Sequence, residues 1–162
     1  MYDIYGEFDT YLEINDKARK LKEAGDKDGV IALAKENGLD IEDAQDFFSG
    51  TLEELTTNTL AALGKIAVES ADLKMFGVFD DWAAEIIMLS TEDEEFSEAV
   101  RRKGKSLAGC FAFLIGEEAE HRKEVDKKIM EKITAKDMPK KLEVSTLNRR
   151  QHIDLIRKYY GR

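Results

Sequence analysis

Glu118 and His121 stand three residues apart, and this Glu-x-x-His spacing places a carboxylate and an imidazole on one face of a helix. Di-iron helical bundles bind metal with this pair, but they need it twice, together with two further glutamates from other helices. The second histidine, His152, has Arg149 three residues before it instead of an acid. We therefore predict no metal site, and we interpret the segment as a solvated helix face with pairs such as Glu118 with Arg122.

Cys110 is the one cysteine among 162 residues, so the chain cannot form an internal disulfide or a cysteine zinc cluster. A catalytic thiol needs a base and exposed, electropositive surroundings. Cys110 instead lies in the apolar stretch Leu107–Ile115, which predicts a buried structural residue. Phosphate loops and the common nucleophile motifs are also missing from the sequence. We therefore expect a protein that is not an enzyme and uses no cofactor.

Charge is distributed unevenly along the chain. The formal net charge is −9, from 25 Lys and Arg against 34 Asp and Glu. Residues 1–100 hold 25 acids and 8 bases, a net charge of −17, while residues 101–162 hold 9 acids and 17 bases, a net charge of +8. Residues 40–98 alone hold 16 acids and 2 bases, a net charge of −14. This surplus argues against ordinary non-specific DNA binding by the whole surface.

The acidic region 40–98 has two functional interpretations. Its carboxylates can imitate the phosphates of nucleic acid and occupy the basic groove of a DNA- or RNA-handling protein, or they can dock less specifically on a basic partner. The remaining alternative is an ordinary acidic surface that keeps the protein dissolved. The candidate partner-binding residues are Asp80, Asp81, Glu85, Glu92, Asp93, Glu94, Glu95 and Glu98.

The basic C-terminal part of the chain is a candidate contact for nucleic acid, and Tyr159 and Tyr160 add aromatic rings that could stack on bases. In the alternative interpretation, these bases neutralise the acidic half, either within one molecule or across a homodimer. The candidate residues are Arg101, Arg102, Lys103, Arg149, Arg150, Arg157 and Lys158, with Lys136, Lys140 and Lys141 in a connector and Arg162 at the end.

Helices have to position these residues, because the chain has a single proline and is rich in good helix formers. Apolar residues at helical spacing predict three short helices within residues 8–50, ended by Gly25, Gly38 and Gly50. Capping patterns at Thr51 and Thr91, each with Glu three residues later, predict two further helix starts, and Asp80 predicts a third.

The longest predicted helix runs from Lys105 to Ile133. Its first half is apolar on most faces, so we expect it to be the central, buried element. Pro139 interrupts helical structure in the connector 136–141, and a last helix ends at Gly161. Short strands near 73–78 and 141–145 would leave room for one small β-hairpin. We expect a mainly α fold, a helical bundle around this central helix, with a small N-terminal helical unit at 1–50 and the main helical domain at 51–162.

Signals for export or membrane insertion are missing from the sequence. The N-terminus carries acids where a signal peptide carries bases. The most apolar stretch, Leu107–Ile115, is too short to span a bilayer. We therefore expect a cytoplasmic protein without membrane contact.

The order of these features resembles the PcfK-like family of conjugative and phage-like elements of gut bacteria. The resemblance lies in KGKSLAGCFAFLIGEEAE at 103–120, in AAEI at 83–86 and in RKYY at 157–160, and LAKENG at 33–38 is similar to segments of small proteins of such elements. The chain departs from the family pattern in its basic connector 136–141 and in having no Trp after Trp82. The family includes Cas9 inhibitors, so the resemblance implies a small non-enzymatic protein of a mobile element.

Taken together, the charge block and the resemblance predict an anti-CRISPR protein, acting in the cytoplasm of a bacterial host. It would bind the basic nucleic-acid channel of a CRISPR effector nuclease through its acidic face. The alternative is an accessory protein of conjugation that binds nucleic acid through the basic C-terminal half.

Overall fold

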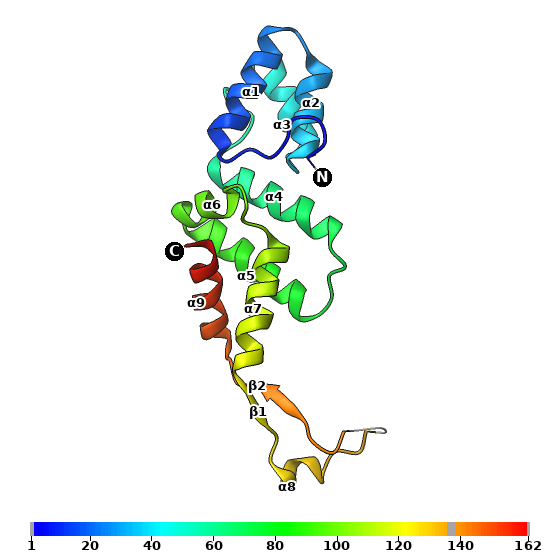
Figure 1. Ribbon diagram of the computed structural model, residues 1–162. Helices are drawn as coiled ribbons and strands as arrows, with labels where there is room; N and C mark the ends of the chain where they lie inside the picture. The colour runs from blue at the N-terminus through cyan, green and yellow to red at the C-terminus, as the bar shows by residue number, and fades with distance from the viewer. Residues whose placement is uncertain (1, 136–138, 162) are drawn as a thin grey trace.

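The computed structural model describes residues 2–135 and 139–161. Within these residues the chain forms nine α-helices and one antiparallel two-stranded sheet, which confirms the predicted mainly helical fold with a small hairpin (Figure 1). The elements are α1 Tyr11–Glu23, α2 Lys27–Glu36, α3 Ile41–Ser49, α4 Asn58–Asp72, α5 Val78–Glu92, α6 Glu94–Arg101, α7 Leu107–Glu120, β1 Arg122–Glu124, α8 Lys127–Met130, β2 Glu143–Ser145 and α9 Arg149–Tyr160.

The three short helices predicted at the N-terminus are confirmed as α1, α2 and α3. Each begins after a polar residue whose side chain accepts a backbone N–H, namely Thr10, Asp26 and Asp40. Gly50 ends α3 with φ of 93°, a left-handed conformation that glycine adopts at little cost. The core of this unit consists of Ile14, Ala18, Val30, Leu33, Ala34, Ala44, Phe47, Leu55 and Ala61.

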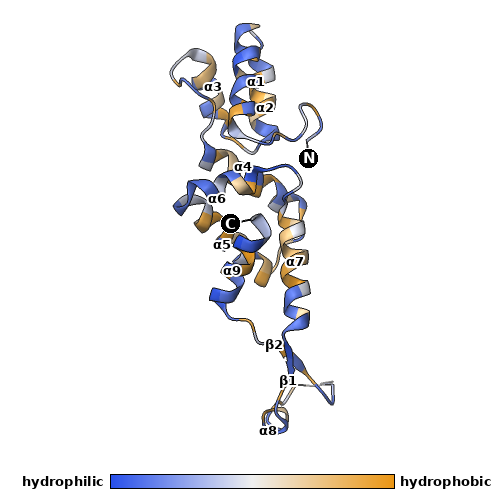
Figure 2. Cartoon of the chain, turned by 60° about the vertical axis from the view of Figure 1, so that its left-hand side comes forward, coloured by the Kyte–Doolittle hydropathy of each residue, from blue (hydrophilic) through white to orange (hydrophobic). Residues whose placement is uncertain are grey.

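A second core lies between α4, α5, α6, α7 and α9. Trp82 of α5 and Phe111 of α7 have ring centroids 5.8 Å apart, and Phe96 of α6 meets Tyr160 of α9 edge to face at 5.3 Å. Figure 2 shows that α7 is hydrophobic along its first turns and hydrophilic toward β1. The burial of its first half, with Leu107, Cys110 and Leu114 fully covered, agrees with the predicted central position.

The two cores meet where the loop after α2 crosses α4. Gly38 and Gly64 approach so closely that a Cβ on Gly64 would come within 3.0 Å of the Asn37 carbonyl oxygen. Leu55 and Ala61, which follow the predicted boundary at residue 50, belong to the N-terminal core. The division into units 1–50 and 51–162 stays a prediction, because residues beyond position 50 help to complete the core of the N-terminal unit.

The helix predicted to start at Thr51 begins seven residues later. Thr57 caps α4 by accepting the Leu60 backbone N–H. The delay has a structural cause, because buried Asn15 binds the Thr56 backbone on both sides: its amide donates to the Thr56 carbonyl at 2.9 Å, and its oxygen accepts the Thr56 N–H at 3.0 Å. These bonds hold Thr56 outside the helix.

The predicted caps Asp80 and Thr91 are also displaced. The α5 helix begins at Val78, after Gly77, so Asp80 lies in its first turn. Thr91 lies inside the last turn of α5, where its hydroxyl donates to the Met88 carbonyl oxygen at 2.8 Å. The cap of α6 is Asp93, whose carboxylate accepts the Phe96 N–H.

The prediction of one long helix from Lys105 to Ile133 is wrong in its second half. The α7 helix ends at Glu120, and residues 122–124 pair as β1 with β2 in the register Arg122 to Ser145. The Thr146 N–H donates to the His121 carbonyl oxygen, which fastens the return strand to the helix end. The strand expected near 141–145 is present, but its partner is β1, and 73–77 connects α4 to α5 without forming a strand. Lys136 and Arg162 lie outside the described residues.

Candidate functional site

The eight candidate acids do not form one continuous face. Asp80 and Asp81 lie in the first turn of α5, and Glu92 ends that helix. Asp80 and Glu92 are twelve positions apart in one α-helix, a distance of about 18 Å along the axis. The structure therefore brings together only the acids around the α5–α6 junction, and we call Glu92, Glu94, Glu95 and Glu98 the junction acids.

The sharp turn at Asp93 gathers the junction acids. Asp93 follows α5 and caps α6 with an extended backbone, φ −137° and ψ 104°, so the two helices follow each other without a loop. Glu92, Glu94, Glu95 and Glu98 are all exposed. Acids in the first turn of a helix are favoured by its dipole, so Glu94 and Glu95 also have a structural reason for their position.

A hollow of about 300 Å³ lies beside the junction acids, between α6 and the start of α1. Glu94, Glu95 and Glu98 line one side of it, and Tyr11 and Leu12 line another. Leu12 is 50% exposed, so part of the lining is an uncovered apolar side chain. This combination suits the guanidinium of an arginine, which pairs with carboxylates and stacks on aromatic faces.

Glu85 and Asp93 differ from the junction acids because α9 binds both of them. Arg149 Nε donates to Glu85 Oε1 at 2.5 Å, and Arg157 Nη1 donates to Asp93 Oδ2 at 2.9 Å. Lys158 pairs with Glu117 of α7 at 3.2 Å. Ion pairs that are open to solvent contribute only about 0–1 kcal/mol each, but the pairs with Glu85 and Asp93 neutralise candidate bases with candidate acids. The interpretation in which the two halves neutralise each other within one molecule therefore applies to α9.

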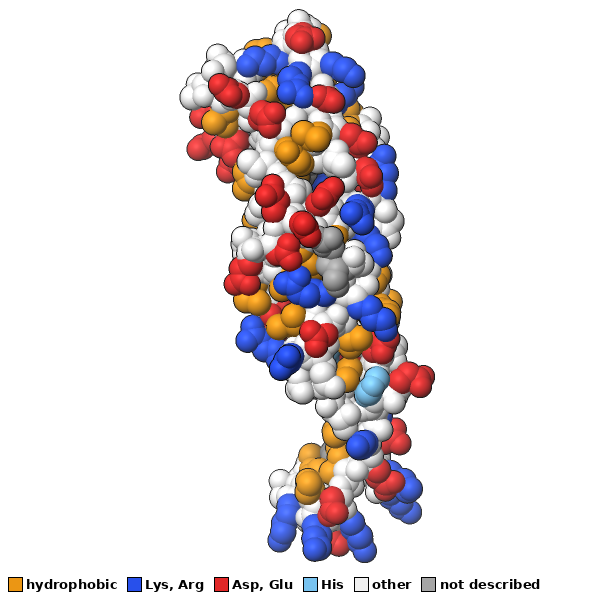
Figure 3. All heavy atoms as spheres, turned by 90° about the vertical axis from the view of Figure 1, so that its left-hand side faces the viewer, with side chains coloured by type: hydrophobic (Ala, Val, Ile, Leu, Met, Phe, Trp, Pro, Cys, Tyr) orange, Lys and Arg blue, Asp and Glu red, His pale blue; other side chains and the backbone are white. Residues whose placement is uncertain are grey.

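The prediction of Arg101 as a nucleic-acid contact is wrong, because this residue is 0% exposed. It ends α6 between the two cores, and its Nη2 donates to Asn37 Oδ1 at 2.7 Å. Arg102, Lys103 and Arg150 are exposed, as expected for surface contacts. Acidic and basic side chains alternate on the face that carries α6 and α9, as Figure 3 shows.

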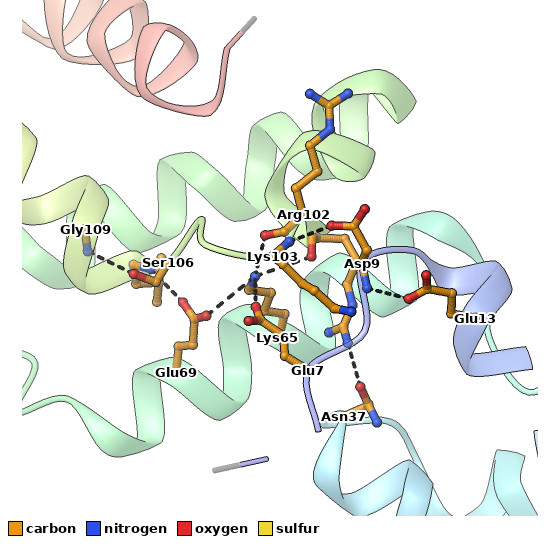
Figure 4. Close-up of polar contacts among 12 residues, drawn as sticks. Glu7, Asp9, Glu13, Asn37, Lys65, Glu69, Arg102, Lys103, Ser106 and Gly109 are labelled. Carbon is orange, nitrogen blue, oxygen red and sulfur yellow. Dashed lines mark hydrogen bonds and ion pairs between the residues drawn. The ribbon is translucent and has the colours of Figure 1, made fainter. Parts of the chain in front are cut away.

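A buried charged cluster around Lys65 was not among the predicted sites. Lys65 of α4 is 1% exposed, and its Nζ donates to Glu7 Oε1 at 2.6 Å and to the Arg102 carbonyl oxygen at 3.0 Å (Figure 4). Glu69, one turn later, accepts the Leu107 N–H at 2.6 Å. The sequence held a signal for this cluster, since Lys65 is one of only two bases in the acidic block and stands among apolar residues of a helix.

Burial shifts the pKa values of the groups around Lys65. Desolvation raises the pKa of Glu69 above its ordinary value of 4.5, against the opposing effects of the Leu107 N–H and of Lys65. Desolvation also raises the pKa of Tyr2 to about 12 and lowers that of Arg101. The Tyr2 hydroxyl and two guanidinium nitrogens of Arg101 have no hydrogen bond of good geometry within the described residues.

A cavity of about 280 Å³ adjoins this cluster, with Tyr2, Glu7, Glu69, Asp72 and Lys105 among its lining residues. Glu7 and Glu69 are held by Lys65 and by the α7 N-terminus. The arrangement ties the N-terminal segment, α4 and the start of α7 together, which is a structural role.

Glu118 pairs with His152 of α9 and not with His121. The Glu118 Oε1 to His152 Nε2 distance is 2.9 Å, and the His152 ring lies against Trp82 with centroids 5.7 Å apart. His121 Nδ1 contacts the Glu117 carbonyl oxygen at 2.7 Å. The pair therefore joins α7 to α9.

Cys110 is fully buried in the second core, and desolvation raises its pKa to about 12. We expect the native protein to react with a thiol reagent such as DTNB at least about a thousandfold more slowly than the urea-unfolded chain, because the thiolate is both scarce and shielded. An exposed thiol introduced as Ala119→Cys is the matched control and should react rapidly. Fast modification of the native wild type would contradict the buried assignment.

Among residues 2–135 and 139–161, the structure has no helix with the length and apolar character needed to cross a bilayer. The function has to be inferred from the surfaces described above, because a scan against protein-family models and searches of curated proteins and of solved structures found no match.

Proposed function

We propose that this protein is a non-enzymatic inhibitor of a CRISPR effector nuclease, encoded by a phage or another mobile element. It presents the junction acids to the basic channel that holds nucleic acid in the effector. The proposal rests on the exposure of these acids and on the sequence resemblance given above.

The observation that carries the proposal is that the junction acids are exposed and gathered at one turn, whereas α9 binds Glu85 and Asp93. Asp80 and Asp81 are exposed too, but they lie at the other end of α5. Glu92, Glu94 and Glu98 are exposed and have no ion-pair partner within the described residues, whereas Glu85 is tied to α9. Unpaired carboxylates on neighbouring turns create a local negative potential that attracts a basic surface and accelerates association. The adjoining hollow offers a place where one arginine of the partner can be bound more specifically.

The alternative, nucleic-acid binding through the basic C-terminal half, is supported less well. Arg101 is buried, and Arg149, Arg157 and Lys158 already face carboxylates of the same chain. Binding phosphates with these residues would require breaking those pairs, and the net charge of −9 would repel the nucleic acid.

The proposal is tested by target-DNA cleavage with purified RNA-guided nucleases, including Cas9 enzymes, after incubation with the wild-type chain. We expect inhibition that weakens as salt increases, because the contact is electrostatic. The triple variant Glu92→Lys, Glu94→Lys and Glu98→Lys should inhibit at least about tenfold less well.

The matched control reverses three exposed acids of the N-terminal part, in the variant Glu23→Lys, Asp46→Lys and Glu53→Lys, and so has the same net charge. Inhibition by this control should equal that of the wild type. Equal inhibition by both variants would overturn the role of the junction acids, and the absence of inhibition across the nucleases would overturn the proposed function. A gel shift with single-stranded DNA that depends on Arg150 would support the alternative.

A further inference from the structure

The hollow beside the junction acids has two walls that are far apart in the sequence. The start of α1 forms one wall, with Thr10, Tyr11 and Leu12. The starts of α4 and α6 form the other, with Asn58 and the junction acids Glu94, Glu95 and Glu98. The hollow therefore exists only where the N-terminal helices meet α6, and its width depends on what holds α1 beside that helix.

The charge of the hollow fits a single cation. Among the described residues, its lining holds three carboxylates and no Lys or Arg. Three helices, α1, α4 and α6, also begin at the hollow, and each N-terminus carries a partial charge of about +0.5. The carboxylates outweigh these partial charges and leave a net charge of about −1.5, which attracts one positive group.

A buried amide adds an acceptor to this lining. Asn58 is only 8% exposed, and its Nδ2 donates to the Glu94 carbonyl oxygen at 2.9 Å. This bond fixes the amide, and no described residue donates a hydrogen bond to its Oδ1. A guanidinium has five N–H donors in one plane, so it can bind this oxygen and a neighbouring carboxylate at the same time.

The α1 wall favours arginine over lysine. Tyr11 is partly buried and Leu12 is 50% exposed, so the wall offers an aromatic ring beside an apolar side chain. A guanidinium is weakly hydrated and stacks on such surfaces, whereas the ammonium of lysine is a compact and strongly hydrated charge. A partner segment that carries arginine therefore fits the hollow better than one that carries lysine.

Asp9 holds the α1 wall in place. It directly precedes the wall residues, and its backbone N–H donates to Glu13 Oε2 in the first turn of α1 at 2.7 Å. Its Oδ1 accepts the Lys103 backbone N–H at 2.8 Å, from 94 positions away and just after the end of α6 (Figure 4). Asp9 therefore ties the start of α1 to the far end of the helix whose start forms the opposite wall.

We propose, resting on the function proposed above, that the hollow holds one arginine side chain of the basic partner and that Asp9 is a positioning residue for this site. Glu7 supports the same arrangement, because its pair with buried Lys65 at 2.6 Å anchors the chain two residues before Asp9. Without the Asp9 contact the α1 wall is free to move away from the acids, and a guanidinium then no longer contacts both walls.

The first test measures binding of N-acetylarginine amide and N-acetyllysine amide to the isotope-labelled full chain by NMR titration. The arginine derivative should shift the backbone amide signals of Leu12 and Glu98 and bind at least about threefold more tightly than the lysine derivative. Glu98→Gln should weaken arginine binding at least about threefold. The matched control Glu53→Gln changes an exposed acid outside the hollow and should leave binding unchanged. Equal binding of the two derivatives, or an effect of Glu53→Gln as large as that of Glu98→Gln, would overturn the arginine site.

The second test separates positioning from charge. Asp9→Ala should weaken binding of N-acetylarginine amide at least about threefold, because the Lys103 N–H loses its acceptor. Asp9→Asn removes the same negative charge but keeps an oxygen that can accept this N–H, so it should bind as the wild type does. Circular dichroism verifies that both variants are folded. Equal weakening by the two variants, or no weakening by Asp9→Ala, would overturn the positioning role.

Nuclease inhibition and arginine binding are measured separately. Selective arginine binding by a chain that inhibits none of the nucleases would support the arginine site and overturn the proposed function. Inhibition by a chain that binds the arginine and lysine derivatives equally would support the proposed function and overturn the arginine site.

Discussion

Replacing Lys65 with methionine is expected to lower the free energy of unfolding by about 3–5 kcal/mol at neutral pH. Methionine keeps most of the packing of the lysine stem but removes the charge. Glu7 and Glu69 then lose their shared cation, and the carbonyl oxygens of Arg101 and Arg102 lose a donor. Urea unfolding followed by circular dichroism measures the change. Lys35→Met on α2, where the side chain is exposed, is the control and should change the free energy by less than about 0.5 kcal/mol.

The same variant has a predicted pH dependence. Burial raises the pKa of Glu69 above 4.5, and Lys65 opposes this rise, so removing Lys65 raises the pKa further. An acid whose pKa is higher in the folded state than in the unfolded state costs stability when it ionises, and the cost disappears as the pH falls toward the unfolded value. The loss in free energy of unfolding caused by Lys65→Met should therefore shrink as the pH falls from neutral to 4.5. A loss in free energy of unfolding that is below about 1 kcal/mol, or that grows as the pH falls, would contradict the stabilising role of the Lys65 cluster.

Replacing Gly64 with alanine should lower the free energy of unfolding by about 1–3 kcal/mol, although alanine is the better helix former. The added Cβ would come within 3.0 Å of the Asn37 carbonyl oxygen. This oxygen belongs to the backbone and cannot rotate away, so the loop after α2 has to move off α4. Thermal or urea unfolding measures the loss.

Gly116→Ala is the matched control for this change. Gly116 lies in α7, and a Cβ there would meet no atom within 4 Å. Alanine should raise the free energy of unfolding by about 0.5–1 kcal/mol at that position, because it reduces the entropy of the unfolded chain and favours the helix. If Gly64→Ala and Gly116→Ala change the free energy of unfolding alike, the close approach of the loop after α2 to α4 does not restrict the residue at position 64.

Local signals predicted the N-terminal helices well. Glycine at positions 25, 38 and 50 and apolar residues at helical spacing are encoded within a few residues, and the capping interactions of Thr10, Asp26 and Asp40 are equally local. The helix starts predicted from the capping patterns at Thr51 and Thr91 are wrong, because other residues bind the backbone near both positions. Asn15 holds Thr56 from 41 positions away, and Asp93 caps α6 in place of Thr91.

The prediction of one long helix from Lys105 to Ile133 is wrong in its second half for a related reason, a contact with a distant part of the chain. Apolar residues at helical spacing continue through Val125, Ile129 and Ile133, but a helix there would project into solvent with no surface to cover its apolar side. Pairing with 143–145 offers the backbone another set of hydrogen bonds, and that pairing is non-local. Periodicity within one segment carries no information about such a partner.

The charges show the same difference between what the sequence determines and what only the folded structure determines. Composition and spacing were enough to establish a mainly helical chain, an acidic first part and a basic end, because these depend on residue types and near neighbours. The three-dimensional packing determined which charges remain available: Arg101 and Lys65 are buried, Arg149 and Arg157 pair with acids of α5 and the α5–α6 junction, and Glu92, Glu94 and Glu98 stay exposed. Ion pairs and burial join residues up to 64 positions apart, and such contacts exist only once the helices have packed.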